Sequence, residues 1–105
     1  MIDESTIVEA GRRIHEAEPE ARVILFGSHA RGTAVDPLSD IDLLVIKPEV
    51  DDAAEESVRL RRALKGLGAP IDVVVVDEDR ARRRASVRGT MVERALREGR
   101  VLVDV

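Results

Sequence analysis

Two aspartates separated by a single residue, Asp40 and Asp42, stand in an otherwise apolar segment, residues 40–46. In a β-strand, side chains at positions i and i+2 point to the same face, so both carboxylates would project together. Two carboxylates about 4 Å apart repel by about 4 kcal/mol at an effective dielectric constant of about 20, before desolvation is counted. Such a pair needs a shared proton, an arginine or a divalent cation to compensate the repulsion.

A third acid, Asp72, begins the next valine-rich run, residues 71–76. If this run and residues 40–46 form neighbouring strands, the three carboxylates converge on one point of the sheet. Clusters of carboxylate oxygens are the ligands that Mg²⁺ prefers. The sequence therefore predicts a magnesium site at Asp40, Asp42 and Asp72.

A short turn upstream, Gly27 and Ser28, directly follows the apolar run at residues 22–26. A glycine at the end of a strand allows backbone amides to approach a phosphate, and the serine hydroxyl can donate to the same oxygens. One loop could then place the end of a triphosphate beside metals held by the aspartates. This layout suits two-metal phosphoryl transfer, in which the ions lie about 3.5–4 Å apart.

The elements that must position these residues follow from the spacing of apolar side chains. Helices are predicted over residues 3–17, 51–67 and 80–99, the second ending at Gly66 and Gly68 and the third broken near Gly89. Strands are predicted over residues 22–26, 40–46, 71–76 and 101–105, with a loop over 29–39 that could contain one helical turn. The pattern indicates an α/β or α+β fold, with a small sheet of about four strands flanked by helices.

The length and composition set limits on the class of protein. A chain of 105 residues is expected to form one domain, residues 1–105. It has no cysteine and no apolar run of the ~20 residues that a membrane span needs, so we expect a cytoplasmic protein without membrane association. Phe26 is the only aromatic residue, which argues against a surface that stacks single-stranded nucleic-acid bases.

The formal net charge of −4 conceals a strong asymmetry. Residues 36–57 hold eight acids against Lys47, whereas residues 80–100 hold eight arginines against Glu93 and Glu98. The basic half is predicted to face a partner or phosphates. Because aromatic residues are absent from it, we favour a protein partner over direct nucleic-acid binding, and we expect a complex with that partner or an oligomer.

These motifs together resemble those of a known family. Phe-Gly-Ser-His-Ala-Arg-Gly at residues 26–32, Ser-Asp-Ile-Asp-Leu-Leu-Val at residues 39–45 and the strand-borne Asp72 are similar to the nucleotidyltransferase superfamily that includes DNA polymerase beta. The chain most resembles the minimal nucleotidyltransferases, whose fold it would share. Members of that group are usually paired with a HEPN-domain ribonuclease toxin, and several act as antitoxins by transferring AMP from ATP to a toxin tyrosine.

The resemblance implies a role for each matching residue. Asp40 and Asp42 would bind two Mg²⁺ ions, for which Mn²⁺ could substitute, and Asp72 would bind one of them. Asp72 could also help to deprotonate the acceptor hydroxyl. Gly27 and Ser28 would hold the β- and γ-phosphates of ATP.

Two further residues are candidates for contact with the nucleotide. Arg31 would touch phosphate, or else orient the loop through a salt bridge. Ser39 would contact the nucleotide, or else shape the start of the strand. His29 departs from the family pattern, in which a basic or aromatic residue is common, and no role is assigned to it.

The resemblance implies a Mg²⁺-dependent protein adenylyltransferase that acts as a type VII-like antitoxin on a toxin encoded as a separate polypeptide. One alternative is a non-catalytic antitoxin that neutralises the toxin by binding alone. Another is a small-molecule transferase of the antibiotic-modifying kind. The second alternative is weaker because those enzymes carry an extra domain for the acceptor, and 105 residues leave no room for it.

Overall fold

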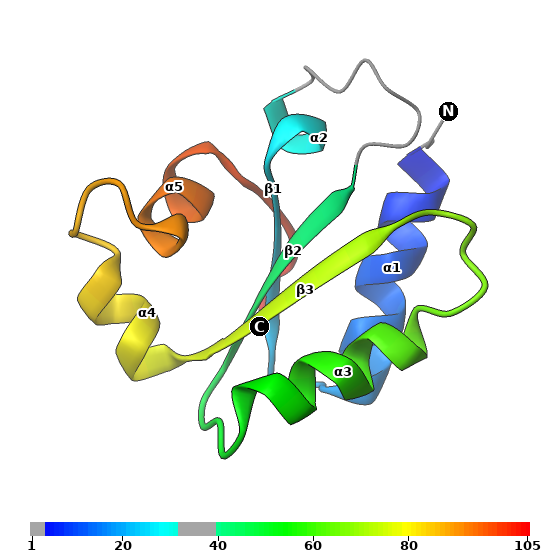
Figure 1. Ribbon diagram of the computed structural model, residues 1–105, viewed down its shortest axis with the longest axis horizontal. Coiled ribbons are helices and arrows are strands. Elements are labelled where there is room, and N and C mark those ends of the chain that lie inside the picture. The colour runs from blue at the N-terminus through cyan, green and yellow to red at the C-terminus, as the bar shows by residue number, and fades with distance from the viewer. Residues whose placement is uncertain (1–3, 32–39) are drawn as a thin grey trace.

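The computed structural model describes residues 4–31 and 40–105, which form a four-stranded mixed sheet with helices on both faces (Figure 1). In chain order the elements are α1 (Glu4–Ala17), β1 (Arg22–Phe26), α2 (Ser28–Arg31), β2 (Ile41–Lys47), α3 (Ala53–Ala63), β3 (Ile71–Asp77), α4 (Glu78–Arg84), α5 (Met91–Glu98) and β4 (Arg100–Val103). The strand order is β3-β2-β1-β4. The predicted fold class and the four predicted strands are confirmed.

The direction of the strands decides which ends meet. β1 is antiparallel to β2 and to β4, whereas β2 and β3 are parallel. The helix α3 connects the two parallel strands, as a parallel pair requires. The C-terminal end of β1 therefore lies at the same end of the sheet as the first residues of β2 and β3.

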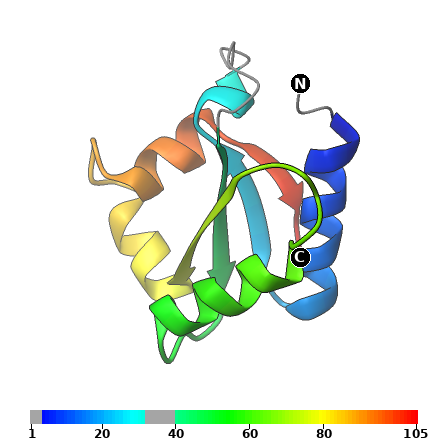
Figure 2. The same ribbon diagram turned by 45° about the vertical axis from the view of Figure 1, so that its right-hand side comes forward.

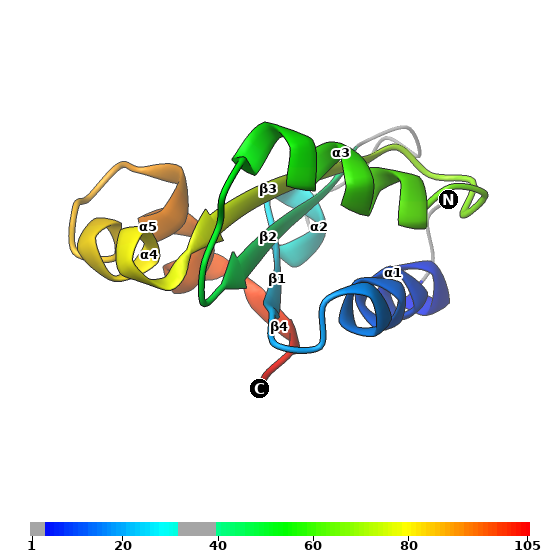
Figure 3. The ribbon, with the colours of Figure 1, turned by 90° about the horizontal axis from the view of Figure 1, so that it is seen from below.

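Each face of the sheet is covered by its own pair of helices (Figure 2 and Figure 3). α1 and α3 pack on one face through Ile14 and Leu60, against Leu43 of β2. α4 and α5 pack on the other face, where Ala81 and Val92 meet the alternate residues of the same strands. The strict alternation of a strand thus divides its apolar side chains between two cores.

The second long helix is shorter than its apolar spacing predicts. α3 begins after Asp52, whose side chain accepts a hydrogen bond from the Glu55 N–H at 3.1 Å, and it ends at Ala63 rather than at residue 67. The N–H of Leu64 donates to the Arg61 carbonyl, three residues before it, so the last turn is tightened as in a 3₁₀-helix. The C-cap is therefore Leu64, and not one of the glycines that follow.

The C-terminal arginine-rich segment is broken where the sequence predicts a break. α4 ends at Arg84 and α5 starts at Met91, with Gly89 between them at a φ of 91°. The Thr90 hydroxyl donates to the Val87 carbonyl at 2.9 Å and accepts from the Glu93 N–H at 3.2 Å. The threonine thus ends one segment and caps the next. Within residues 4–31 and 40–105, no helix combines the length and apolar character needed to span a membrane.

Candidate active site

The strand register brings two of the predicted site residues side by side. Asp42 of β2 is the register partner of Asp72 in the parallel strand β3. On its other side, Asp42 is the register partner of Phe26, the last residue of β1. Paired residues of neighbouring strands point to the same face, so Phe26, Asp42 and Asp72 form a row across three strands at one end of the sheet.

This row lies on the face that α4 and α5 cover. Leu44 and Ile46, which alternate with Asp42 along β2, belong to the apolar cluster of that face, and Phe26 packs partly against the same cluster. Asp42 is half-buried, whereas Asp72 is exposed, with 55% of its side-chain surface accessible. The acids therefore lie at the border between an apolar floor and solvent.

Gly27, the residue after β1, packs closely against Asp42, which with Asp72 forms the acidic row. Its φ is +79°, a left-handed conformation that glycine adopts readily and other residues rarely adopt. A Cβ added there would collide with Oδ2 of Asp42. The absence of a side chain at Gly27 is therefore what allows the turn after β1 to pack directly on the Asp42 carboxylate.

Ser28 follows as the first residue of α2, and both Ser28 and His29 are partly buried. The turn of Gly27 and Ser28 thus lies beside the acidic row, as the sequence predicts for a phosphate-holding turn. Asp40 is exposed and stands one residue before β2. Arg31 closes α2 with its backbone, while Ser39 lies outside the described residues.

A residue that sequence reasoning missed also reaches this site. Nη2 of Arg61, on α3, lies 3.6 Å from Oδ1 of Asp72, and 49% of the Arg61 side chain is exposed. An ion pair this open to water contributes only about 0–1 kcal/mol, because solvent screens it. No local pattern marks Arg61, since α3 and β3 come together only in the folded chain.

The residues present fit a magnesium ion by their chemistry. Within the described ranges, no three His, Cys, Asp or Glu side chains are grouped closely enough to hold a metal ion by themselves. Mg²⁺, however, is usually bound by one or two carboxylates together with waters and substrate phosphates. Asp42 and Asp72 are register partners, and the turn at Gly27 packs against Asp42, so these two carboxylates offer that kind of partial site.

A cavity with a volume of about 810 Å³ lies at the opposite end of the sheet. Its lining includes the Lys47 cluster, in which Nζ of Lys47 bonds Glu56 and lies 3.1 Å from Glu18, and Arg59 lies 2.5 Å from Glu18. Burial lowers the pKa of Lys47, but its hydrogen bonds to Glu56 and Glu18 outweigh this and raise it. These cations are already used in holding α3 to the sheet, so the cavity is not our candidate for catalysis.

A family model and several solved structures match the chain. The family model of the nucleotidyltransferase domain matches residues 6–102. A crystal structure of a putative nucleotidyltransferase from Sulfolobus solfataricus is 27% identical, with a TM-score of 0.58 over 75% of this chain and 70% of the other. No curated protein matches the chain.

Two toxin–antitoxin crystal structures share the fold. One, described as a toxin–antitoxin with AMP-PNP, is 24% identical and has a TM-score of 0.57, covering 99% of this chain and 75% of its own. The other, a mutant of the toxin–antitoxin MntA–HpeT, is 21% identical and has a TM-score of 0.61, covering 100% of this chain and 75% of its own.

Proposed function

Because the chain belongs to the nucleotidyltransferase domain family, we propose that it transfers AMP from ATP to a hydroxyl group of a partner protein. The partner in this proposal is a HEPN-domain ribonuclease toxin, modified on a tyrosine and thereby neutralised. The toxin–antitoxin complexes that share the fold support a toxin partner, and the one with AMP-PNP supports an adenine nucleotide as donor. With ATP as donor and no cysteine to oxidise, the cytoplasm is the expected compartment.

The observation that carries the proposal is the packing of Gly27 against Asp42, whose register partner is Asp72. Gly27 allows the backbone to approach the β- and γ-phosphates, and the Ser28 hydroxyl would donate a hydrogen bond to them. Asp40 and Asp42 would hold two Mg²⁺ ions and Asp72 one of them, and the chemistry that these ions supply when bound is neutralisation of charge on the transferred phosphate.

The transfer step is a substitution at the α-phosphorus of ATP. The acceptor oxygen forms a bond to the α-phosphorus of ATP, the bond from that phosphorus to the bridging oxygen breaks, and diphosphate leaves with its electron pair. Asp72, exposed at the edge of the row, would receive the proton of the acceptor hydroxyl. Arg31 and Ser39 remain candidates for contact with the nucleotide.

The test is transfer of label from ATP, marked at its α-phosphate, to the partner toxin in the presence of Mg²⁺. We expect labelled tyrosine with the wild-type chain, and at least about a hundredfold slower labelling with Asp42→Asn. Asp104→Asn, which changes an exposed acid after β4, is the matched control and should label at the wild-type rate. No label from wild type, or equal label from Asp42→Asn, would falsify the proposal.

Neutralisation is measured separately from transfer. The Asp40→Asn/Asp42→Asn variant is mixed with the toxin, and the remaining ribonuclease activity is followed with and without ATP. We expect this variant to leave the toxin active. Full neutralisation by equimolar variant would instead mean that binding alone silences the toxin.

A further inference from the structure

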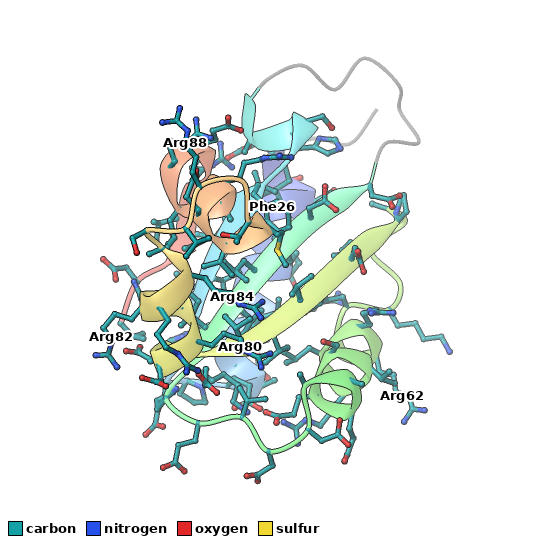
Figure 4. The ribbon with its side chains drawn as sticks, turned by 60° about the vertical axis from the view of Figure 1, so that its left-hand side comes forward. Phe26, Arg62, Arg80, Arg82, Arg84 and Arg88 are labelled. Carbon is teal, nitrogen blue, oxygen red and sulfur yellow. The ribbon has the colours of Figure 1, made fainter. Side chains whose placement is uncertain are left out.

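We propose that the open part of the sheet face beside Asp42 and Asp72 receives an acidic segment of the acceptor protein, which Arg80 and Arg84 of α4 hold by charge. The proposal rests on the proposed function and names the chemistry by which that function selects its acceptor. It concerns the face shown in Figure 4, with α4 and α5 along one side of β2 and β3.

The floor of this surface is apolar and only partly covered. Ala81 of α4 and Ala95 of α5 are buried on this face of the sheet. Phe26 and Val74, on the same face, remain only partly buried. α4 and α5 therefore leave this part of the face only partly covered. We call the partly buried face at Phe26 and Val74, next to the acidic row, the strip, and an extended segment could lie along it.

Two arginines border this strip. Arg80 and Arg84 are four residues apart, so they lie on the same side of α4. Figure 4 shows both side chains pointing from α4 over β2 and β3, with Arg84 between Arg80 and Phe26 in that view. Both residues are exposed, and neither forms an ion pair with any residue that the structure describes.

The other two arginines of α4 are paired within the helix. Arg83 lies 3.3 Å from Asp79, and Arg82 lies 3.9 Å from the same carboxylate. Figure 4 shows Arg82 pointing away from the sheet. α4 therefore carries two cations that are paired within the helix, and two cations over the strip that have no ion-pair partner among the described residues.

The ATP phosphates are too distant to be the natural partners of Arg80. β3 runs from Ile71 to Asp77, and α4 begins only after its last residue. Asp77 is five positions after Asp72 along the strand, which is about 17 Å at ~3.3 Å per residue. Phosphates held beside Gly27 and Asp72 would not extend that far, so Arg80 is placed to serve the acceptor.

An acidic protein segment suits this surface better than a nucleic acid. Phe26 is the only aromatic residue of the chain, so bases would find almost nothing to stack on. Asp77, Glu78 and Asp79 at the start of α4 would repel a continuous phosphate backbone. A short run of carboxylates can instead pair with the two arginines while its tyrosine reaches the acidic row.

The experiment measures binding without ATP, by fluorescence anisotropy. The probes are a labelled tyrosine peptide with Asp and Glu on both sides, the same peptide with Asn and Gln, and a single-stranded oligonucleotide of equal charge. We expect the acidic peptide to bind about tenfold more tightly than the neutral one, and this preference to vanish in Arg80→Glu/Arg84→Glu. Circular dichroism confirms that each variant is folded.

Arg82→Glu/Arg83→Glu is the matched control, since it changes the net charge by the same amount on the same helix. It should keep the preference within about twofold. Equal affinity for the two peptides, equal loss of preference in both variants, or tighter binding of the oligonucleotide would each overturn the proposal. Because no transfer is measured, this result stands apart from the labelling test, and a chain that binds the acidic peptide without labelling a toxin would contradict only the proposed function.

Discussion

Asp42 and Asp72 are direct register partners across the parallel pair β2–β3, with Gly27 packed against the first of them. Neighbouring strands lie about 4.8 Å apart, so two like charges share one face of the sheet at short range. Like charges placed opposite each other across strands are destabilising. The fold therefore holds an electrostatically unfavourable pair of carboxylates directly beside the glycine turn that follows β1.

Divalent metal should stabilise the folded protein. A dication bound at ten times its Kd adds about 1.4 kcal/mol to the free energy of unfolding, which raises Tm by about 5 °C or more for a chain of this size. Differential scanning calorimetry with millimolar Mg²⁺ or Mn²⁺, each with and without ATP, measures the shift. The Asp42→Asn/Asp72→Asn variant should show no shift in Tm. A wild-type Tm that does not change with metal under any of these conditions would count against the site.

Replacing Gly27 should damage the site through a single methyl group. In Gly27→Ala the left-handed backbone conformation costs about 1–2 kcal/mol, and the added methyl group also collides with the carboxylate of Asp42. Gly68→Ala has a similar φ of +75° but nothing within 4 Å, so it carries the strain alone. In urea titrations we expect Gly27→Ala to be the less stable of the two.

The two glycine variants should also differ in their rates of label transfer. In Gly27→Ala the added methyl group should displace the Asp42 carboxylate and slow transfer by about a hundredfold, whereas Gly68→Ala should stay near the wild-type rate. Equal rates in the two variants would show that the contact between Gly27 and Asp42 has no part in catalysis.

Arg61 should compete with metal for Asp72. Removing its charge in Arg61→Gln deprives Asp72 of a screened ion pair worth about 0–1 kcal/mol, so the affinity for Mn²⁺ should rise by up to about fivefold. Isothermal titration calorimetry measures the change. Arg62→Gln, on the adjacent position of α3, is the control and should leave the affinity unchanged. Weaker binding of Mn²⁺ by Arg61→Gln would mean that Arg61 helps to form the site.

Stability at acidic pH should depend on Glu56. Its hydrogen bond from Lys47 lowers its pKa from the ordinary 4.5, although burial opposes the shift. A group with a lowered folded-state pKa contributes stability fully above its unfolded pKa and loses it as the pH falls through the folded value. The contribution should therefore be complete at pH 7 and disappear below about pH 4.5.

The measurement is urea unfolding of wild type and Glu56→Gln between pH 7 and pH 3. We expect the variant to be less stable by about 1–2 kcal/mol at pH 7, with the difference narrowing as the pH falls below 4.5. Glu55→Gln, which changes an exposed neighbour on α3, should follow the wild-type curve. A difference between Glu56→Gln and wild type that does not change with pH would exclude titration of Glu56 as its cause.

Local patterns in the sequence were sufficient for most of the elements. The apolar run at residues 22–26 became β1 without change, and the valine run became β3 with Asp77 added. The helix over residues 51–67 was predicted too long because Leu64 and Leu67 continue the apolar spacing after hydrogen bonding has turned the chain out of the helix. Spacing reports which side chains can share a face, and it does not report where the backbone stops being helical.

The sequence by itself determined the chemistry available to this protein: an Asp-x-Asp pair, a strand-borne Asp72, a glycine turn and a basic C-terminal segment. Only the tertiary structure decided which of these residues meet, because strand order and register depend on packing between segments that are distant along the chain. It placed Asp72 beside Asp42, brought Arg61 to Asp72, and turned Arg80 toward the sheet and Arg82 away from it. The two-residue period of a strand tells which face of the sheet a side chain lies on. Which residue of the next strand lies beside it depends on the register, and the register is fixed by burial of the apolar side chains on both faces.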